Sequence, residues 1–578
     1  EKLEEITLGT GGKQAAQPVE PLAQSRFSAM SPAEQEVQRE QAIAMIDQRI
    51  SSIQLQQRFT IERRIGVNSD IRNSDVEAQT QYGSVRPSQL NSYGKTQLLT
   101  GEISRWRIQA SKVSITPEGW TADRMGFTND PFTPAQTRID SEGVIAKEQP
   151  NGDVLIKSAR NQLIIEERLP IPVSRTQRIT QEKVENRWVF GIDNDDRDGF
   201  FVGRDLKPIE LSKTTKLSLQ PQLLLQRAID GTTTSYVKPS SSIGSPKVSQ
   251  PLEISDIFGL EAELTSQIWG WEVEADADIS TFNPDNFMNG SRFWGEVTKD
   301  VTLPWLGALK LRGFSAYRFR AFNGSLGETD VYSAFGGFLE KRGEFQIGKI
   351  SNNYIWRIGA GNYQAEQFQS ENLTDLWRAN FYGSLNSRYQ IWRGKPAART
   401  PQAAYRYSPV AIVPGLAFRT NINTLLAAYG NGVRQTTVSL SGGPSLTLGT
   451  FSKPFLDYTQ LSITGGGTLQ QGASPFNFDQ AIDLGTLGVG VTQQIAGPLV
   501  INLGVGLNID PVSEFYGDVI DSNIELRWQR RSYDFGFYFN PYEGIGGFRF
   551  RLNDFNFTGT GVPFIPYNPS NELNNRPF

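Results

Sequence analysis

The chain has 578 residues, a formal net charge of −4 at pH 7, and neither cysteine nor histidine. The missing histidines exclude a Ser-His-Asp triad and a histidine-ligated zinc site, and the missing cysteines exclude disulfides and thiolate metal sites. The slightly acidic balance gives no reason to expect nucleic-acid binding, and no apolar run reaches the roughly 18 residues that a membrane-spanning helix requires. Mean hydropathy is −0.39, which still allows a membrane β-barrel because only alternate strand residues face lipid.

The first 52 residues are expected to form a lead-in. Residues 1–30 are rich in Gly, Gln, Ala and Pro, which is typical of a flexible segment. The sequence Ser31-Pro32-Ala33-Glu34 is a capping box with proline at the first helical position, and it predicts a short structural helix over residues 31–52. The charged opening lacks the apolar stretch of a signal peptide, so we expect the sequence to begin inside a longer precursor.

Residues 53–175 carry short stretches of alternating apolar and polar residues separated by polar turns, the pattern of short β-strands. A compact β-sandwich or an open β-groove fits this pattern best. The apolar residues that share strand faces are therefore candidates for the core of a sandwich or for the lining of a groove: Trp106, Ile108, Val113, Ile115, Val154, Ile156, Leu163 and Ile165.

From residue 176 to residue 557 the alternating stretches become longer. The clearest strand runs from Trp271 to Ile279, with aromatic and aliphatic residues on one face and four carboxylates, Glu272 to Asp278, on the other. Neighbouring carboxylates repel one another, so they require water or cations opposite them. Basic residues of other strands are candidates to supply those cations across a lumen: Lys310, Arg312, Arg318 and Arg320.

Further two-faced strands are predicted over residues 499–509, 524–529, 533–539 and 547–553, with hairpin turns at Gly270, around Gly343, at 496–498 and at 541–544. At about 10 residues per strand, this region holds roughly 20 strands. An open sheet of that size would leave bare edges, and closure removes them. A soluble propeller would show a fixed repeat of roughly 40 to 50 residues, and none is found. The predicted fold is all-β, with a large antiparallel transmembrane β-barrel.

Motifs between residues 101 and 208 resemble a known family. The motifs are WRIQASKVSI at 106–115, Gly119-Trp120 with Ala122, RMGFTNDPFTP at 124–134, RLPIP at 168–172 and DRDGFF at 196–201. Their order is similar to that of the LPS-assembly protein LptD family, also called organic solvent tolerance protein OstA, in its divergent cyanobacterial branch. The closing strand, Gly547-x-x-Phe550-x-Leu552, and the terminal Phe578 also resemble the signal that the barrel-assembly machinery reads in outer-membrane barrels.

The resemblance implies an outer-membrane protein whose N-terminal domain lies in the periplasm. In that family a β-jelly-roll with a lipid groove, here residues 53–175, receives lipopolysaccharide from an LptA-like bridge protein. A lateral gate between the first and last strands of the barrel, here residues 176–557, then releases the lipid into the outer leaflet of the outer-membrane bilayer. A tail over 558–578 would follow. The resemblance implies no catalytic residue, cofactor or metal, and an LptE-like plug is expected only if this shorter-looking barrel has room for one.

Prolines mark the expected gate, because proline cannot donate a ladder hydrogen bond and so weakens strand pairing. The family carries prolines in its first barrel strands. Here Pro208 falls in a candidate first strand and Pro221 in the next, although each also fits an ordinary strand start or turn. The lateral-gate candidates, including the partner strand and the domain junction, are Pro170, Pro172, Pro208, Pro221, Phe548, Phe550 and Leu552.

Other functions stay open at this stage. The charged inner strand faces also fit a porin-type diffusion channel for small hydrophilic solutes. An enzyme is disfavoured by the missing histidines; the run Asp193-Asn194-Asp195-Asp196 has oxygen ligands that suit calcium, but such a run is more often a solvated turn.

Family members with paired cysteines tie the groove domain to the barrel by disulfides. In this chain the domain orientation is expected to depend on packing or on the linker around residues 169–175.

Overall fold

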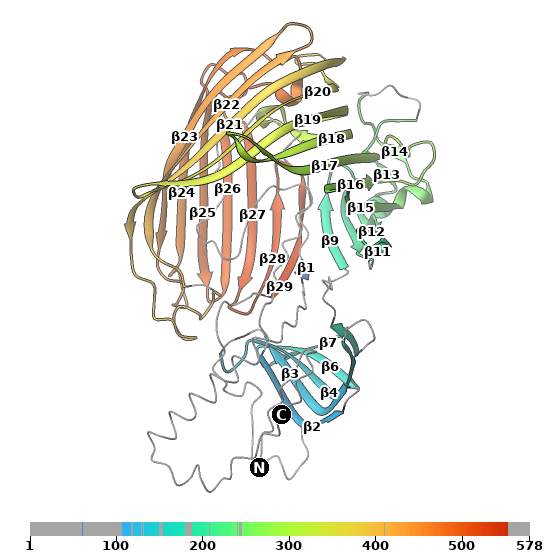
Figure 1. Cartoon of the computed structure of the whole chain (residues 1–578), viewed down its shortest axis with the longest axis vertical. Helices are drawn as coiled ribbons and strands as arrows, with labels where there is room; N and C mark the ends of the chain where they lie inside the picture. The colour runs from blue at the N-terminus through green and yellow to red at the C-terminus, as the bar shows by residue number, and fades with distance from the viewer. Residues whose placement is uncertain are drawn as a thin grey trace.

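Figure 1 shows the computed structural model of the chain. The structure describes residues 60–61, 107–116, 119–128, 130, 132–148, 154–179, 188–206, 208–239, 241, 245–370, 372–409 and 411–552. The predicted lead-in, helix and tail, together with Trp106, lie outside these residues. Within the described ranges, no helix is long and apolar enough to cross a membrane.

Seven short strands form an N-terminal sheet with the order β2-β3-β4-β5-β8, in which β6 pairs with β4 and β7 pairs with β6. Strands β5 and β6 follow β4 in one unshifted register, so they act as two halves of a single bent strand. The bounds are β2 Arg107–Thr116, β3 Gly119–Thr128, β4 Thr137–Glu148, β5 Val154–Lys157, β6 Arg160–Ile165, β7 Leu169–Pro172 and β8 Thr176–Ile179.

Eighteen strands close into an antiparallel barrel, which confirms the predicted fold class. The number is below the roughly 20 expected because several strands are long, up to the 21 residues of β21. The barrel strands are β9 Trp188–Asp193, β10 Gly199–Arg204 with β11 Ile209–Ser212, β12 Thr215–Leu223, β15 Phe258–Ile268, β16 Trp271–Ile279, β17 Ser291–Leu303, β18 Gly307–Phe322, β19 Glu328–Ile347, β20 Ile350–Glu366, β21 Leu373–Arg393, β22 Gly415–Tyr429, β23 Arg434–Leu448, β24 Thr459–Gly472, β25 Gly485–Ala496, β26 Leu499–Asn508, β27 Val519–Gln529, β28 Tyr533–Asn540 and β29 Ile545–Leu552.

The smaller elements lie in the connections or at the barrel edge. Two residues form β1, and they pair with β29. The bounds are β1 Thr60–Ile61, α3 Leu225–Asp230, β13 Thr232–Thr233, β14 Gln250–Pro251, η1 Ile254–Ile257, η2 Gly324–Leu326 and η3 Asn477–Asp479.

The barrel wall has an apolar outside and a polar inside, as strand alternation dictates. On β22 the outward residues Phe418, Ile422 and Leu426 are exposed, whereas Asn421 and Asn423, between them, are buried. Exposed rows of this kind are stable only against lipid, because a continuous apolar band in water favours association. The structure is therefore a barrel of the outer-membrane type.

The two ends of the barrel differ. We call the end that faces the N-terminal sheet the near end, and the other the far end (Figure 1). Most connections at the near end are short turns, apart from those over 394–414 and 449–458, and two of the short turns carry fully exposed tryptophans, Trp269 and Trp305. Tryptophans at a strand end are typical of the membrane interface, where an amphipathic ring lies at headgroup level.

The far end is filled by the chain's own loops. Phe476 and Phe478, from the loop over 473–484, are buried in an apolar cluster with inward residues of the wall such as Phe338, Tyr363 and Tyr429. Polar contacts connect this loop to its neighbours: the Asn323 side chain donates hydrogen bonds to the carbonyls of residues 477 and 480. At the far end this loop is therefore packed against the inner wall and tied to the neighbouring loop.

One predicted hairpin turn is misplaced. The chain turns at Gly348, which has a φ of 57°, and not around Gly343. Gly343 lies inside β19 and pairs with Tyr354 of β20. A Cβ atom at Gly343 would lie 2.6 Å from the Tyr354 ring, so the glycine makes room for a neighbouring aromatic side chain.

Candidate functional site

An apolar stripe crosses one face of the N-terminal sheet. Pairing places Trp120 of β3 opposite Ala146 of β4, and Ala146 opposite Ile156 of β5. Opposed residues share a face, and these three side chains are buried, with 8%, 1% and 4% exposure. The next pair along the stripe, Ala122 and Val144, is buried as well. The stripe offers apolar side chains from three adjacent strands to whatever packs against it.

The predicted groove residues divide between the two faces of this sheet. In register with the stripe lie Ile115, paired with Trp120, Val113, paired with Ala122, and the β5 residues Val154 and Ile156. The residues Ile108, Leu163 and Ile165 are in register with the opposite face. Their respective pairing partners are Phe127, Ile139 and Thr137.

Alternation separates the two groups, because the β3–β4 register is constant from one end to the other. Ile139 therefore lies on the face away from Val144 and Ala146. The central members of the stripe were missed in the sequence because they are mostly small. The alternating signal was nevertheless present in Trp120-x-Ala122 and Val144-x-Ala146.

The N-terminal sheet is fixed to the near end of the barrel by a buried contact, which we call the clamp. The Arg531 Nε, in the turn between β27 and β28, donates hydrogen bonds of 2.8 and 2.9 Å to the two carboxylate oxygens of Asp130. The Gln136 Oε1 accepts a 3.0 Å hydrogen bond from the backbone N–H of Arg531. A second contact joins Arg530 to Glu166 at 2.8 Å. Packing against the barrel therefore orients the sheet, which is one of the two alternatives predicted from the sequence.

The second prediction was that a linker around residues 169–175 fixes the orientation of the sheet. These residues do not form a linker between the sheet and the barrel. Residues Leu169–Pro172 form β7 and pair with β6, so Pro170 and Pro172 belong to the N-terminal sheet and do not lie beside the barrel seam. The misplacement has a simple cause. Prolines are tolerated at sheet edges, and β7 is an edge strand among the described strands.

The barrel closes at a seam between its first strand, β9, and its last, β29. Only three residue pairs join them: Ile545 with Asp193, Gly546 with Ile192, and Gly547 with Gly191. The neighbouring pair of strands, β28 and β29, shares eight residue pairs. The seam is thus much shorter than the pairing on the other side of the last strand, and it is paired only toward the far end.

The first barrel strand is β9, so Pro208 and Pro221 lie one strand further from the seam than predicted. Pro208 falls in the break between β10 and β11, and Pro221 lies in β12, the third strand. The sequence pattern does not reveal the hairpin from β9 to β10, because its Asp-rich turn resembles an ordinary solvent-exposed loop. The β10–β12 pairing stops at Gly203 with Gln222, next to Pro221.

Pro221 interrupts the hydrogen bonds on the seam side of β12. The backbone of Leu219 faces β10 and β11, since its carbonyl accepts a hydrogen bond from the N–H of Leu206 at 2.8 Å. Alternation turns the backbone of residue 221 the same way, so the donor missing from this proline is one that would bond the second strand. The ladder next to the seam is weak for this reason.

The last strand presents Phe548 on the outer surface of the barrel. Phe548 is 46% exposed and its partner Phe537 on β28 lies with its ring centroid 5.3 Å away. On β9, Phe190 is 43% exposed. The backbones of Phe550 and Leu552 follow on β29, where Phe550 pairs with Ile61 of β1. The three predicted residues thus lie on the last strand, beyond the three pairs that join it to β9.

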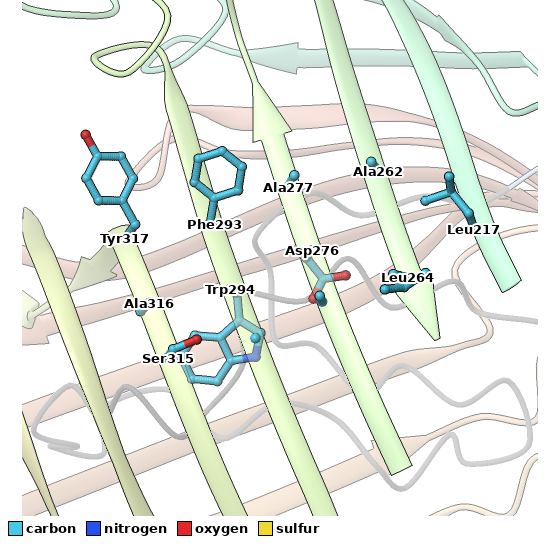
Figure 2. Close-up of a pocket in the computed structure, with 12 residues that line it drawn as sticks. Leu217, Ala262, Leu264, Asp276, Ala277, Phe293, Trp294, Ser315, Ala316 and Tyr317 are labelled. Carbon is cyan, nitrogen blue, oxygen red and sulfur yellow. The ribbon is translucent and has the colours of Figure 1, made fainter. Parts of the chain in front are cut away.

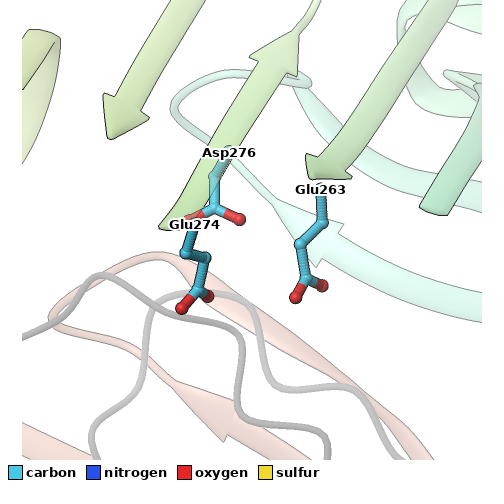
Figure 3. Close-up of side chains that lie close together, drawn as sticks. All are labelled: Glu263, Glu274 and Asp276. Carbon is cyan, nitrogen blue, oxygen red and sulfur yellow. The ribbon is translucent and has the colours of Figure 1, made fainter. Parts of the chain in front are cut away.

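The inner wall at β16 carries the predicted carboxylates, and their partners are partly those expected. Lys310 lies 3.5 Å from Glu272, whereas Asp278 is paired at 2.7 Å with Arg197, a residue that the pattern had not singled out. Figure 3 shows two more of the predicted carboxylates, Glu274 and Asp276, together with Glu263 of β15; one carboxylate oxygen of each lies within 4.8 Å of the others. The wall is therefore polar and acidic.

The Asp-rich turn after β9 is a buried ionic cluster. Asp193 is paired with Arg197 at 2.7 Å, and Arg292 bonds Asp196 at 2.8 Å. Burial opposes ionisation of Asp196, but Arg292 and Arg320 hold its pKa well below the ordinary range. Arginines thus neutralise this turn, which is buried and not a solvated turn. The cluster ties the first hairpin to the inner wall.

An apolar depression lies on the wall formed by β12, β15, β16, β17 and β18 (Figure 2). Small residues form its floor, among them Ala262, Ala277 and Gly295, and the larger Leu217 and Phe293 border it. The depression begins at β12, two strands from the seam.

Residues 100–556 match the model of a family described as protein of unknown function (DUF3769). The chain belongs to this family. The match runs from before β2 to beyond β29, so the N-terminal sheet and the barrel are parts of one DUF3769 unit. No curated protein matches the sequence of this DUF3769 chain.

Two solved structures share a distant likeness with the DUF3769 chain. CdiB from Acinetobacter baumannii has 8% identity and a TM-score of 0.26; the match covers 66% of this chain and 63% of CdiB. The alcaligin outer-membrane receptor FauA from Bordetella pertussis has 9% identity and a TM-score of 0.21, with 81% and 98% of the two chains covered. At these TM-scores neither likeness bears on the activity of the DUF3769 chain.

Proposed function

We propose that this protein is a non-enzymatic outer-membrane translocon, which receives lipopolysaccharide from a periplasmic bridge protein and releases it sideways into the outer leaflet. The observation that carries the proposal is the seam, where only three residue pairs join the first and last strands. Each unpaired backbone group in lipid costs several kcal/mol. A barrel that needs no side exit would therefore extend this pairing.

The two environments along the proposed route match the two parts of an amphiphile. Acyl chains require apolar surroundings, because their transfer into water is unfavourable in proportion to the exposed area. The stripe around Trp120, Ala146 and Ile156 supplies such a surface. Sugars and phosphates require water or polar partners, and the inner wall over β12–β18 supplies these. Since the stripe is buried, entry of an acyl chain requires its cover to move.

The far end favours a lateral exit over an axial one. A molecule that enters the near half of the lumen meets the apolar cluster of Phe476, Phe478 and Tyr363. The adjoining loops are held by hydrogen bonds such as that from the Tyr542 hydroxyl to the carbonyl of Gly324, at 2.6 Å. We propose that these loops take the place that an LptE-like plug has in related barrels.

The bridge protein would join the N-terminal sheet by strand addition. Among the described strands, β2 and β8 are at the two ends of the main sheet order and each has one neighbour. An edge strand with free N–H and C=O groups binds another strand through main-chain hydrogen bonds. An LptA-like protein with an open sheet edge is a partner of the required kind.

Photo-crosslinking in cells tests the proposed route. A photo-reactive amino acid at Ile156, in the stripe, is expected to capture lipopolysaccharide. The matched control is Ile145, which is 47% exposed and lies on the opposite face of the adjacent strand β4. Capture at neither Ile156 nor Trp120, or equal capture at Ile145, would contradict the proposal.

A porin-type diffusion channel is the second candidate, because the inner wall is polar. It predicts a large, steady ion conductance for the purified protein in a planar bilayer. The packed far end predicts a low conductance that rises only when the loop over 473–484 is released. Large conductance in the unaltered protein would favour the channel.

A further inference from the structure

The N-terminal sheet is attached to both sides of the seam. On one side, β8 ends at Ile179 and the chain continues into β9, which begins at Trp188. On the other side, the clamp binds the turn between β27 and β28, and β28 is the direct neighbour of the last strand. The sheet therefore connects the two flanks of the seam, covalently to the first strand and by contact to the last hairpin.

The clamp is a buried ion pair, and it holds the sheet in one position on the barrel. The side chains of Asp130 and Arg531 are 0% and 6% exposed, so the ion pair is withdrawn from water. A buried pair is strongly destabilised when its geometry is lost, because each charge is then left without a partner. Arg531 also donates a 2.8 Å hydrogen bond to the carbonyl of Pro134, and its guanidinium lies 5.4 Å from the ring centre of Phe132.

The seam stops short although both of its strands continue. The observed register would next pair Phe190 with Phe548, since each preceding pair advances by one residue on β29 and recedes by one on β9. Both residues lie within strands, yet the pairing ends at Gly191 and Gly547. Among the described residues, Thr60 and Ile61 pair with the remaining edge, opposite Arg551 and Phe550.

We propose that the N-terminal sheet acts as a wedge that straddles the seam and holds its near end open. Unpaired strand edges attract each other, because each backbone N–H and C=O requires a partner. The structure pairs β9 with β29 only at the end remote from the sheet; at the end where the sheet is attached, Phe190 and Phe548 do not pair, and β1 pairs with the β29 edge beyond Phe548. Docking of the sheet, through Arg531, thus sets the width of the lateral opening.

This inference rests on the proposed function in one respect only, namely that the opening serves to release lipid. Its test measures the opening itself, in purified protein without any lipid cargo. The chain has no cysteine, so the pair Phe190→Cys and Phe548→Cys forms the only possible disulfide within a molecule. These positions are 43% and 46% exposed on the outer surface, where an oxidant reaches them.

In this cysteine background, Arg531→Gln is expected to raise the disulfide yield several-fold, because the released edges pair further along the register. Arg531→Lys keeps the charge and is expected to give an intermediate yield. The matched control is Arg160→Gln, which removes an exposed pair with Glu142 in the same sheet. An unchanged or lower yield in Arg531→Gln, with a folded barrel shown by its heat-modifiable gel mobility, would overturn the wedge.

The two proposals fail in different ways. A raised yield in Arg531→Gln together with no capture of lipopolysaccharide at Ile156 would support the wedge and contradict the translocon. Capture at Ile156 with no effect of Arg531→Gln on the seam would contradict the wedge and leave the translocon supported.

Discussion

Arg378 on β21 donates two hydrogen bonds, of 2.6 and 2.8 Å, to the carboxylate of Asp479 in the far-end loop. Both side chains are buried, at 4% and 0% exposure. The Tyr429 hydroxyl donates to the same carboxylate, and the Gln435 side chain bonds the carbonyl of Asp479 at 2.8 Å. One aspartate thus holds the loop over 473–484 against three strands of the wall.

Asp479→Ala is expected to release this loop. The change leaves the Arg378 charge buried without its partner, a loss of about 3–5 kcal/mol in the free energy of unfolding. Single-channel recording should show a higher conductance than in the unaltered protein. Asp375→Ala is the control, because Asp375 is exposed on β21 and accepts a 2.7 Å hydrogen bond from Asn362 of β20, so its loss leaves no charge buried. Unchanged conductance in Asp479→Ala would mean that the loop is held by other contacts.

The outward position of Leu440 tests the membrane orientation of the barrel. Leu440 is 58% exposed and lies near the middle of β23. Leu440→Arg is expected to cost about 2–4 kcal/mol, as an arginine at the bilayer midplane does. Denaturant unfolding in lipid vesicles measures this cost. The same change at Leu456, which is 66% exposed in a near-end connection, should cost far less; equal costs would contradict the orientation.

Glu543 makes stability depend on pH. Burial, with smaller contributions from nearby Asp521 and Asp195 and against the opposing charge of Arg320, raises the pKa of Glu543 from its ordinary 4.5 to about 8. The folded chain therefore binds this proton more tightly than the unfolded chain. The resulting stabilisation is fully present below pH 4.5 and is lost as the pH rises through about 8.

Glu543→Gln is expected to remove that part of the pH dependence. Thermal melting in detergent between about pH 5 and pH 9 should show a smaller fall in Tm for the variant than for the unaltered protein. Burial also raises the pKa of Asp195 to about 7, so a residual slope near neutral pH is expected in the variant. Parallel curves for the two proteins would contradict the burial of a neutral Glu543.

Pro221→Val is expected to strengthen the ladder beside the seam. The valine supplies the N–H that faces the second strand, which is worth about 0.5–1.5 kcal/mol for one net hydrogen bond. Greater thermal stability and slower surface appearance of lipopolysaccharide should follow together. The control is Pro511→Val in an exposed far-end loop. Faster release in Pro221→Val would show that this proline does not weaken the gate.

The sequence was sufficient for the wall of the barrel. Trp271 to Ile279 alternates without interruption, and β16 has these same bounds. Such a pattern predicts a strand because each face has one environment. The fold class followed from many such strands, since the only way to remove the edges of so large a sheet is to close it.

The seam and the clamp could not be predicted from local sequence patterns. Asp130 and Arg531 lie 401 residues apart, and neither local pattern marks the other as its partner. The Asp-rich turn after β9 hid the first strand, because acidic runs usually lie in solvent, whereas here Arg197 and Arg292 neutralise it. Register between the first and last strands depends on closure of the whole barrel, which no single segment encodes.

Locking the seam tests the lateral exit most directly. In cells that carry Phe190→Cys with Phe548→Cys, oxidation is expected to stop the delivery of lipopolysaccharide to the cell surface, and reduction should restore it. The matched control, Leu526→Cys with Phe537→Cys, joins directly paired residues of β27 and β28 and should leave delivery unchanged. Continued delivery through a fully oxidised seam would contradict release between β9 and β29.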